Sequence, residues 1–145
     1  MRALVQRVRS ARVRVGDDLV GEIGAGLCVL VGVAASDTDD VARRLARRVA
    51  HLRVFENEDG KFDRSLLDVG GGALVVSQFT LIADTRKGNR PSFTAAAGPE
   101  QARPLYGVFC DQLRLEGIAE VEMGKFGARM LVEIANDGPV TIILE

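Results

Sequence analysis

The sequence predicts one α+β domain with a largely antiparallel sheet and two long helices. Seven or eight short segments have the apolar pattern of strands, and several follow one another at the spacing of hairpins. Two longer segments have apolar residues at helical spacing instead. No linker, low-complexity tract or internal repeat divides the chain, so we assign residues 1–145 to a single domain.

The composition is that of an ordinary globular protein, with 47% hydrophobic and 27% charged residues. The formal net charge of −1 argues against a protein that coats duplex nucleic acid, but it leaves room for a small basic patch. No apolar run approaches the roughly 20 residues of a membrane span. The N-terminal arginines are not followed by the apolar core of a signal peptide. We therefore expect no association with a membrane.

The two cysteines, Cys28 and Cys110, lie far apart and have neither CxxC nor metal-ligand spacing. Their apolar neighbours favour two buried, reduced thiols over a functional pair, so we expect a cytoplasmic location. The one histidine, His51, is more readily explained as a structural residue than as a catalyst. No cluster of ligand side chains points to a metal, and we expect no cofactor.

Strands dominate the first third of the chain. Residues 1–15 alternate between apolar and polar side chains, which predicts a half-buried strand whose pattern is interrupted near Ser10. Gly- and Asp-rich turns separate it from a second strand at 19–23 and from residues 27–33. Because residues 27–33 are apolar on both faces, we expect them to form a central strand.

The first helix follows, with Ser36 or Asp37 as its expected cap. Its buried stripe consists of the apolar residues at helical spacing, Val41, Leu45, Val49 and Leu52. Arginines at 43, 44, 47 and 48 lie mostly off this stripe. Contacts with phosphates are one explanation of them, and an exposed, solvated face is the more common one.

Strand patterns resume with a short strand at 53–55 and a strong one at 73–79, which leads into a polar loop. The second helix begins around Gly98 and Pro99 and ends at Gly117. The residues expected on its inward face are Leu105, Phe109 and Leu113.

The last quarter of the chain predicts strands at 119–123 and 128–134. A turn is expected at 136–139, where Asn, Asp, Gly and Pro follow one another. Residues 140–144 then form a final apolar strand.

The common catalytic motifs are absent from the sequence. There is no GxSxG, HExxH, P-loop or GxGxxG pattern, and one histidine without a partner cannot be assigned to a triad. An enzyme built from this chain must therefore use hydroxyls, backbone groups and its own substrate.

Two polar segments are candidates for a site. Residues 77–81 (SQFTL) end the strong strand with two hydroxyls and an amide, and polar residues at a strand end often line a site. Residues 136–141 (NDGPVT) include Gly138, whose backbone a ligand can approach closely, and Pro139, whose φ is fixed. The plain alternatives are a strand that turns into a loop and a hairpin turn.

These segments belong to a wider resemblance that covers nearly the whole chain. MRALVQRV, LRVFENEDGKFDRSLLDVGGGALVVSQFTL, ADTRKGNRPSF and FGARMLVEIANDGPVTIILE all resemble the D-aminoacyl-tRNA deacylase family. SQFTL and NDGPVT, in this order and at this separation, are specific to that family. The resemblance implies a compact, barrel-like homodimer that hydrolyses the ester of D-aminoacyl-tRNA and rejects the L form, as a proofreading step in translation.

The resemblance also implies roles for individual residues. One segment lines the pocket for the 3′-terminal aminoacyl-adenosine and carries the catalytic groups, and it comprises Ser77, Gln78, Phe79, Thr80 and Leu81. The Gly138-Pro139 dipeptide is cis in the family and reaches into the active site of the partner subunit. Arg7 helps to fix this dipeptide, and Phe126 and Met130 pack around the terminal adenosine.

We hypothesise that water attacks the ester while N–H groups near Gln78, Phe79 and Thr80 stabilise the oxyanion. The ribose 2′-hydroxyl would orient the water or carry its proton. A scheme with Thr80 as covalent nucleophile ranks lower, because no base is evident to activate it. Carbonyls of Gly138 and Pro139 would hold the α-ammonium so that an L side chain collides with the backbone, and glycyl-tRNA would escape this rejection.

Two other classes of function remain open on the residues alone. One is a non-catalytic RNA- or nucleotide-binding module that uses the same pocket. The other is a structural homodimer in which residues 140–144 serve only assembly. Basic side chains such as Lys87 and Arg90 are candidates for contacts with the phosphates of a bound tRNA.

Overall fold

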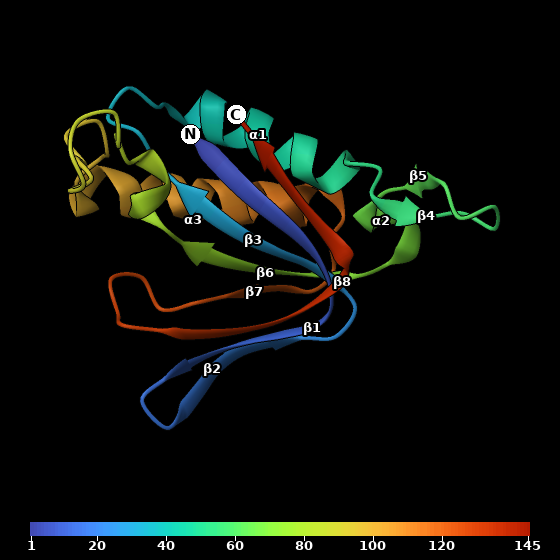
Figure 1. Cartoon of the computed structure of the whole chain (residues 1–145). Helices are drawn as coiled ribbons and strands as arrows, with labels where there is room; N and C mark the ends of the chain where they lie inside the picture. The colour runs from blue at the N-terminus through green and yellow to red at the C-terminus, as the bar shows by residue number, and fades with distance from the viewer.

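The computed structural model describes all residues 1–145, and its strands form a mixed sheet that curls into a nearly closed barrel (Figure 1). The strand order is β2-β1-β3-β6-β7, and β8 pairs with β1. The strands of this sheet are β1 (Arg2–Val15), β2 (Asp18–Ile23), β3 (Gly26–Gly32), β6 (Gly72–Ser77), β7 (Val121–Met123) and β8 (Leu131–Leu144). The pairs of β1 are antiparallel, whereas β3–β6 and β6–β7 are parallel.

Two long helices, α1 (Asp39–His51) and α3 (Pro99–Glu116), cover one face of this sheet (Figure 1). The α+β class and the two long helices are thus confirmed. None of the helices combines the length with the apolar composition that a membrane-spanning helix needs.

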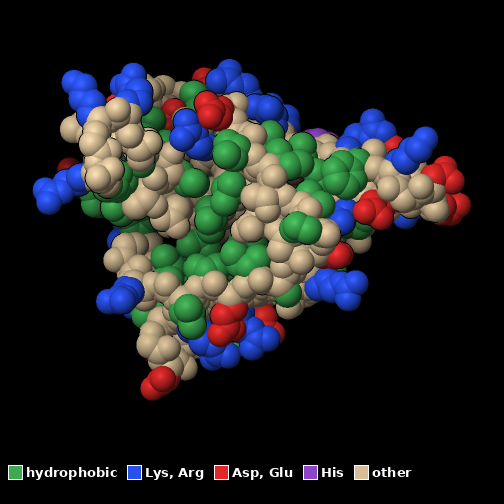
Figure 2. Space-filling model, viewed as in Figure 1, with side chains coloured by type: hydrophobic (Ala, Val, Ile, Leu, Met, Phe, Trp, Pro, Cys, Tyr) green, Lys and Arg blue, Asp and Glu red, His purple; other side chains and the backbone are tan.

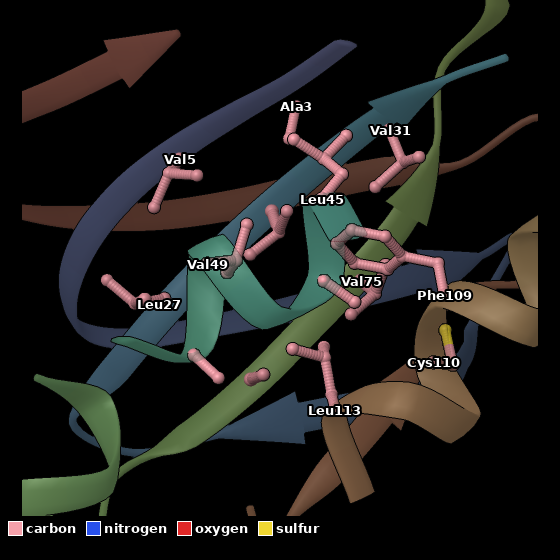
Figure 3. Close-up of a cluster of buried hydrophobic side chains, with 14 of the residues drawn as sticks. Ala3, Val5, Leu27, Val31, Leu45, Val49, Val75, Phe109, Cys110 and Leu113 are labelled. Carbon is pink, nitrogen blue, oxygen red and sulfur yellow. The ribbon is translucent and has the colours of Figure 1, made fainter. Parts of the chain in front are cut away.

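The central strands β3 and β6 are buried on both faces, as predicted for residues 27–33. On one face Leu27, Val31 and Val75 pack against Phe109 and Leu113 of α3 in the larger hydrophobic core (Figure 3). On the other face a smaller core inside the barrel contains Cys28 and Leu74 with residues of β1 and β2. Burial on both faces explains why these strands are continuous apolar runs.

Strand β1 is continuous, but its burial pattern changes in the middle. Ala3 and Val5 face the larger core, whereas Val8, Ala11 and Val13 face the smaller one. The register with β8 shifts between Gln6 and Val8 and again before Ser10. The interruption predicted near Ser10 is therefore a pair of bulges that turns the strand to its other core, not a break.

The start of α1 differs from the prediction. The N-cap is Thr38, whose hydroxyl accepts a hydrogen bond from the Val41 amide, and not Ser36 or Asp37. The carboxylate of Asp37 instead accepts bonds from the Met1 ammonium and the Ala34 amide, each at 2.7 Å. It ties the N-terminus to the loop before the helix, a long-range contact that local spacing does not reveal.

The expected turn at 136–139 is not a turn between two strands. Val8 pairs with Asn136 and Gln6 pairs with Thr141, so both halves of β8 pair with the same strand, β1. Residues 137–140 form a bulge opposite Arg7, and the Gly138-Pro139 peptide bond in it is cis. The prediction of a separate strand at 140–144 was wrong for this reason.

The smaller elements lie between α1 and α3. They are a protruding hairpin of β4 (Phe55–Glu56) and β5 (Phe62–Arg64), the short helix α2 (Leu66–Val69) and the 3-10 helix η1 (Phe79–Ile82). The strand predicted at 53–55 is β4, displaced toward the hairpin. The strand predicted at 73–79 ends at Ser77, because the chain then turns into η1.

Candidate active site

A cleft of about 520 Å³ lies at the carboxyl end of β6, between η1, the start of α3 and the loop that joins β7 to β8. Its lining is mainly apolar. Five of the residues predicted for the site lie in this lining, namely Ser77, Gln78, Phe79, Phe126 and Met130. Two segments that are almost 50 residues apart in sequence are thus brought to one cavity.

The position of η1 at the cleft depends on close packing against β3. The Gln78 amide donates a 2.7 Å hydrogen bond to the Val31 carbonyl, which extends the pairing of β6 with β3 by one residue. A Cβ atom at Gly32 would lie 2.9 Å from the Gln78 carbonyl oxygen and 2.9 Å from Cβ of Leu81. Only glycine at position 32 lets η1 sit this close to the sheet.

The start of η1 supplies hydrogen-bond donors beside the cleft. Phe79 and Thr80 are its first residues, and the first N–H groups of a helix have no acceptor within it. No side chain caps this end of η1. Since the Gln78 amide is used in the sheet, the free main-chain donors are those of Phe79 and Thr80. Two such N–H groups form an arrangement that can stabilise an oxyanion.

The other two residues of the SQFTL segment lie outside the lining. Thr80 is exposed, and its hydroxyl accepts a hydrogen bond from the side-chain amide of Gln78. The carbonyl of Leu81 accepts a 2.7 Å hydrogen bond from Nη1 of Arg2, which holds the end of η1 against β1. The structure therefore places Leu81 in the support of the cleft and not in its wall.

Several wall residues were not anticipated from the sequence. Pro99 and Ala102 in the first turn of α3, with Ala97 just before the helix, form one side of the cleft. Gly98 and Pro99 predicted where this helix begins. They did not predict that its first turn would line the cleft. Small apolar residues are the commonest core residues, so no local pattern marks them as part of a site.

Phe126 stands at the edge of the cleft between two other side chains. Its ring centroid is 6.0 Å from that of Tyr106, and the guanidinium carbon of Arg103 is 4.9 Å from the ring centroid on the outer side. The Tyr106 hydroxyl donates a 2.6 Å hydrogen bond to the Val75 carbonyl, and burial raises its pKa. Tyr106 is thus a neutral, fixed support for Phe126.

None of the side chains in the lining of the cleft is ionisable. His51, the last residue of α1, lies beside the carboxyl end of α3, where its Nε2 is 3.0 Å from a carboxylate oxygen of Glu116. The 14 residues from Ala102 to Glu116 correspond to about 21 Å along the helix. Catalysis in this cleft must therefore depend on polar uncharged groups and the substrate.

The two cysteines are free and buried, as predicted. Burial raises the pKa of Cys28 and of Cys110 to about 12, so both thiols are protonated and unreactive at neutral pH.

Gly138 and Pro139 lie away from this cleft. Arg7 is opposite Leu27 of β3, which in turn is opposite Ala73 of β6, four residues before Ser77. Four residues of strand span about 13 Å. A single chain therefore does not bring the Gly-Pro segment to the SQFTL segment, and both Gly138 and Pro139 are exposed.

Arg7 links the Gly-Pro segment to the hairpin of β4 and β5. Its Nε donates a 2.9 Å hydrogen bond to the Asp137 carbonyl, and its Nη1 donates a 2.8 Å bond to the Val54 carbonyl. Gly138 has a φ of 143°, and a Cβ there would lie 2.8 Å from Cγ2 of Val140. Both the contacts of Arg7 and the absence of a side chain at 138 fix the course of this segment.

Comparison with known sequences gives matches along the whole chain. A family model described as D-Tyr-tRNA(Tyr) deacylase matches residues 4–145. A D-aminoacyl-tRNA deacylase of Roseiflexus sp. (strain RS-1) is 59% identical over 145 residues, which are 100% of this chain and 93% of that relative. The D-aminoacyl-tRNA deacylase of Thermus aquaticus is 57% identical, and the match covers 100% of this chain and 95% of the relative.

Solved structures give the same result for the fold. The c-Myc DNA unwinding element binding protein is 46% identical and superposes with a TM-score of 0.94 over 100% of this chain and 98% of its own. A probable eukaryotic D-amino acid tRNA deacylase is 22% identical, with a TM-score of 0.84 over 99% of this chain and 97% of its own. The second similarity concerns the fold alone.

Proposed function

This chain belongs to the D-Tyr-tRNA(Tyr) deacylase family, and from that premise we propose how its cleft hydrolyses the ester of D-aminoacyl-tRNA. The products are a free D-amino acid and a tRNA with a free 3′ end. The observation that carries the mechanism is the pair of free main-chain N–H groups at the start of η1, beside a cleft without ionisable side chains.

In the first step water attacks the carbonyl carbon of the ester, and the carbonyl oxygen becomes an oxyanion. The amides of Phe79 and Thr80, the first two residues of η1, donate hydrogen bonds to that oxygen in this proposal. One such donor typically contributes about 10²–10³ in rate. The apolar walls strengthen these bonds, because they exclude water that would compete for the oxyanion.

In the second step the bond between the carbonyl carbon and the ribose oxygen breaks. The proton lost by the water passes to that departing oxygen, which becomes the free hydroxyl of the tRNA. We assign this proton transfer to the neighbouring ribose 2′-hydroxyl, which lies next to the ester in every aminoacyl-tRNA. Catalysis is then mainly a matter of position, with the substrate supplying the missing group.

The contacts of Thr80 favour this scheme over a covalent one. A threonine nucleophile needs a base to remove its proton. The neighbour of the Thr80 hydroxyl is the side-chain amide of Gln78, which donates to it and accepts no proton. Thr80 is better suited to hold Gln78 in place at the wall of the cleft.

We propose that selection for the D form uses Gly138 and Pro139 from a second copy of the chain. Both residues are exposed and lie at the other end of the sheet from their own cleft. On β8, Leu131 and Ile143 are 60% and 57% exposed, and Figure 2 shows hydrophobic side chains along a hollow in this face. An unpaired apolar surface of this kind favours a homodimer.

In such a dimer the carbonyls of Gly138 and Pro139 accept hydrogen bonds from the α-ammonium of the substrate. The α-carbon then lies against main chain, where an L side chain collides and a D side chain points outward. Because only the wrong hand is rejected, the enzyme accepts many D-amino acids. Glycyl-tRNA has no side chain to reject and is a further expected substrate.

One assay tests the proposed function directly. The protein is incubated with D-tyrosyl-tRNA and, separately, with L-tyrosyl-tRNA, and loss of the ester is followed. We expect rapid loss of the D ester and no acceleration for the L ester. Binding without hydrolysis of either ester would identify a non-catalytic RNA-binding module instead, and neither binding nor hydrolysis would leave only a structural dimer.

The expected location is the cytoplasm, where translation takes place. The two free, buried cysteines are compatible with a reducing compartment.

A further inference from the structure

The rim of the cleft carries basic side chains that form no ion pair and no side-chain hydrogen bond within the chain. Three such residues, Arg103, Lys125 and Arg129, are on the segments that form the cleft, and two more, Lys87 and Arg90, are on the loop that follows η1. None of the five forms an ion pair or donates a side-chain hydrogen bond. All five are exposed. Figure 2 shows Lys and Arg side chains along this edge of the molecule, at the left.

Acidic side chains do little to neutralise this rim. Asp84, in the loop after η1, is engaged by Arg86 through two side-chain hydrogen bonds of 2.9 and 2.7 Å. Glu100, in the first turn of α3, is the remaining carboxylate of these segments. The formal net charge of the whole chain is only −1, so the excess of positive charge at the rim is local and not a property of the entire surface.

Arg103 is held at the mouth of the cleft by a wall residue. Its guanidinium carbon lies 4.9 Å from the ring centroid of Phe126, a cation–π geometry. Lys125 precedes Phe126, and Arg129 lies between the wall residues Ala128 and Met130. Three cations without an ion-pair partner are therefore next to wall residues of the cleft, Arg103 through its contact with Phe126 and Lys125 and Arg129 through their place in the chain.

The contrast between wall and rim indicates the chemistry of the ligand. The wall has no ionisable side chain and suits an uncharged group such as a nucleoside. The rim suits groups that are negatively charged and repeat along a chain. A single-stranded RNA end has this order, because each nucleoside is joined to the next by a phosphodiester, and proteins that bind single strands combine a positively charged path with ring stacking.

We propose that Arg103, Lys125 and Arg129 form a binding site for the phosphodiester groups that lead to the terminal nucleoside in the cleft. Lys87 and Arg90 extend this site along the loop after η1. The proposal rests on the proposed function, and it adds that the rim recognises the RNA backbone without reading its bases. It predicts that the rim determines affinity for tRNA, not the rate of the chemical step.

The test compares two substrates that differ only in phosphate. D-tyrosyl-tRNA carries the whole 3′ end, whereas D-tyrosyl-adenosine carries the same ester without phosphate. The variants are Arg103→Gln and the double variant Lys125→Gln/Arg129→Gln. Arg44→Gln on α1 is the matched control, because Arg44 is also exposed and has no ion-pair partner but lies on another element.

For the rim variants we expect the ratio of kcat/KM on tRNA to kcat/KM on the adenosine ester to fall several-fold. KM for tRNA should rise while kcat changes little. The slope of log KM against log salt concentration should decrease by about 0.7 for each phosphate contact removed. Arg103→Lys should restore most of this slope, since it keeps the charge.

An unchanged ratio and slope in both rim variants, or an equal change in Arg44→Gln, would overturn the proposal. This outcome is separate from failure of the proposed function, in which the wild-type protein hydrolyses neither ester. Circular dichroism of each variant shows whether a loss reflects unfolding, and the comparison of two substrates for one variant does not depend on the amount of folded protein.

Discussion

Single residues at two points allow the backbone to take courses that other side chains would block. Gly32 lets η1 approach β3, and Gly138 lets the bulge of β8 pass Arg7 and Val140. The sequence predicted the importance of Gly138, because a Gly-Pro pair in a polar segment is conspicuous. It did not reveal Gly32, because the atoms that crowd it belong to a segment 46 residues further along the chain.

Gly32→Ala should impair catalysis more than folding. The added Cβ must displace η1, and with it the two amides that are proposed to bind the oxyanion. We expect kcat to fall by at least about tenfold, since one misplaced donor costs about 10²–10³ when lost completely. Gly24→Ala is the matched control, because nothing lies within 4 Å of a Cβ there. Equal kcat values for the two variants would contradict this role of Gly32.

Pro139→Ala should relax or abolish the preference for the D ester while the fold is kept. Proline fixes its own φ and has no N–H, so alanine makes this exposed segment more mobile and adds a donor where only acceptors are required. The measurement is the ratio of kcat/KM for D-tyrosyl-tRNA and L-tyrosyl-tRNA. An undiminished ratio in a folded variant would rule out a role for Pro139 in chiral selection.

At the level of elements, strands and helices with strong local patterns were predictable. The strands β2, β3 and β6 and the two long helices follow from apolar spacing and from Gly, Pro and Asp at their ends. What local patterns could not supply is pairing. The bulge in β8 has the sequence of a hairpin turn, and only the pairing of both its sides with β1 shows that it is not one. The N-cap of α1 is not Asp37, because the carboxylate of Asp37 binds the N-terminal ammonium.

The carboxyl ends of α1 and α3 are joined by Glu116. Its carboxylate accepts hydrogen bonds from His51, Arg47 and Gln112, and these bonds lower its pKa to about 2, with His51 the largest contributor. The folded pKa is below the ordinary value of 4.5. The resulting stabilisation is therefore complete above about pH 4.5 and is lost as the pH falls toward 2.

Glu116→Gln should thus be less stable than the wild-type protein at pH 6, by about 1 kcal/mol or less for a site near the surface. The difference should shrink between pH 4.5 and pH 2. Urea unfolding at several pH values measures it. A difference that stays constant over this range would show that the charge of Glu116 does not contribute.

At the level of the whole molecule, the cleft was predictable only through resemblance. Hydroxyls and amides at a strand end are too common to indicate a site, and the small residues of α3 that form its wall have no distinctive pattern. The separation of Gly138-Pro139 from the cleft within one chain is a property of the folded protein that no local pattern reveals. It makes the homodimer a requirement of the proposed chiral selection.

Mixed dimers test that requirement. Gly138→Ala disrupts the segment offered to the partner, and Gly32→Ala disrupts the cleft of its own chain. In a mixed dimer, the Gly138→Ala subunit has an intact cleft and the Gly32→Ala subunit has an intact Gly-Pro segment. These two intact parts form one complete site only if the segment acts on the cleft of the other subunit. We expect mixing to restore D-selective hydrolysis above the level of either variant alone. If mixing restores nothing although mixed dimers form, the segment does not act across the interface.

In the proposed mechanism, a cleft without an ionisable side chain hydrolyses the ester with main-chain donors and a hydroxyl of the substrate. The most direct measurement is the single-turnover rate of ester hydrolysis for D-tyrosyl-tRNA whose terminal adenosine lacks the 2′-hydroxyl. We expect that this substrate still binds but is hydrolysed at least about a hundredfold more slowly, the usual contribution of a positioned proton-transfer group. Hydrolysis at the full rate would contradict this mechanism and would mean that the protein itself supplies the proton transfer.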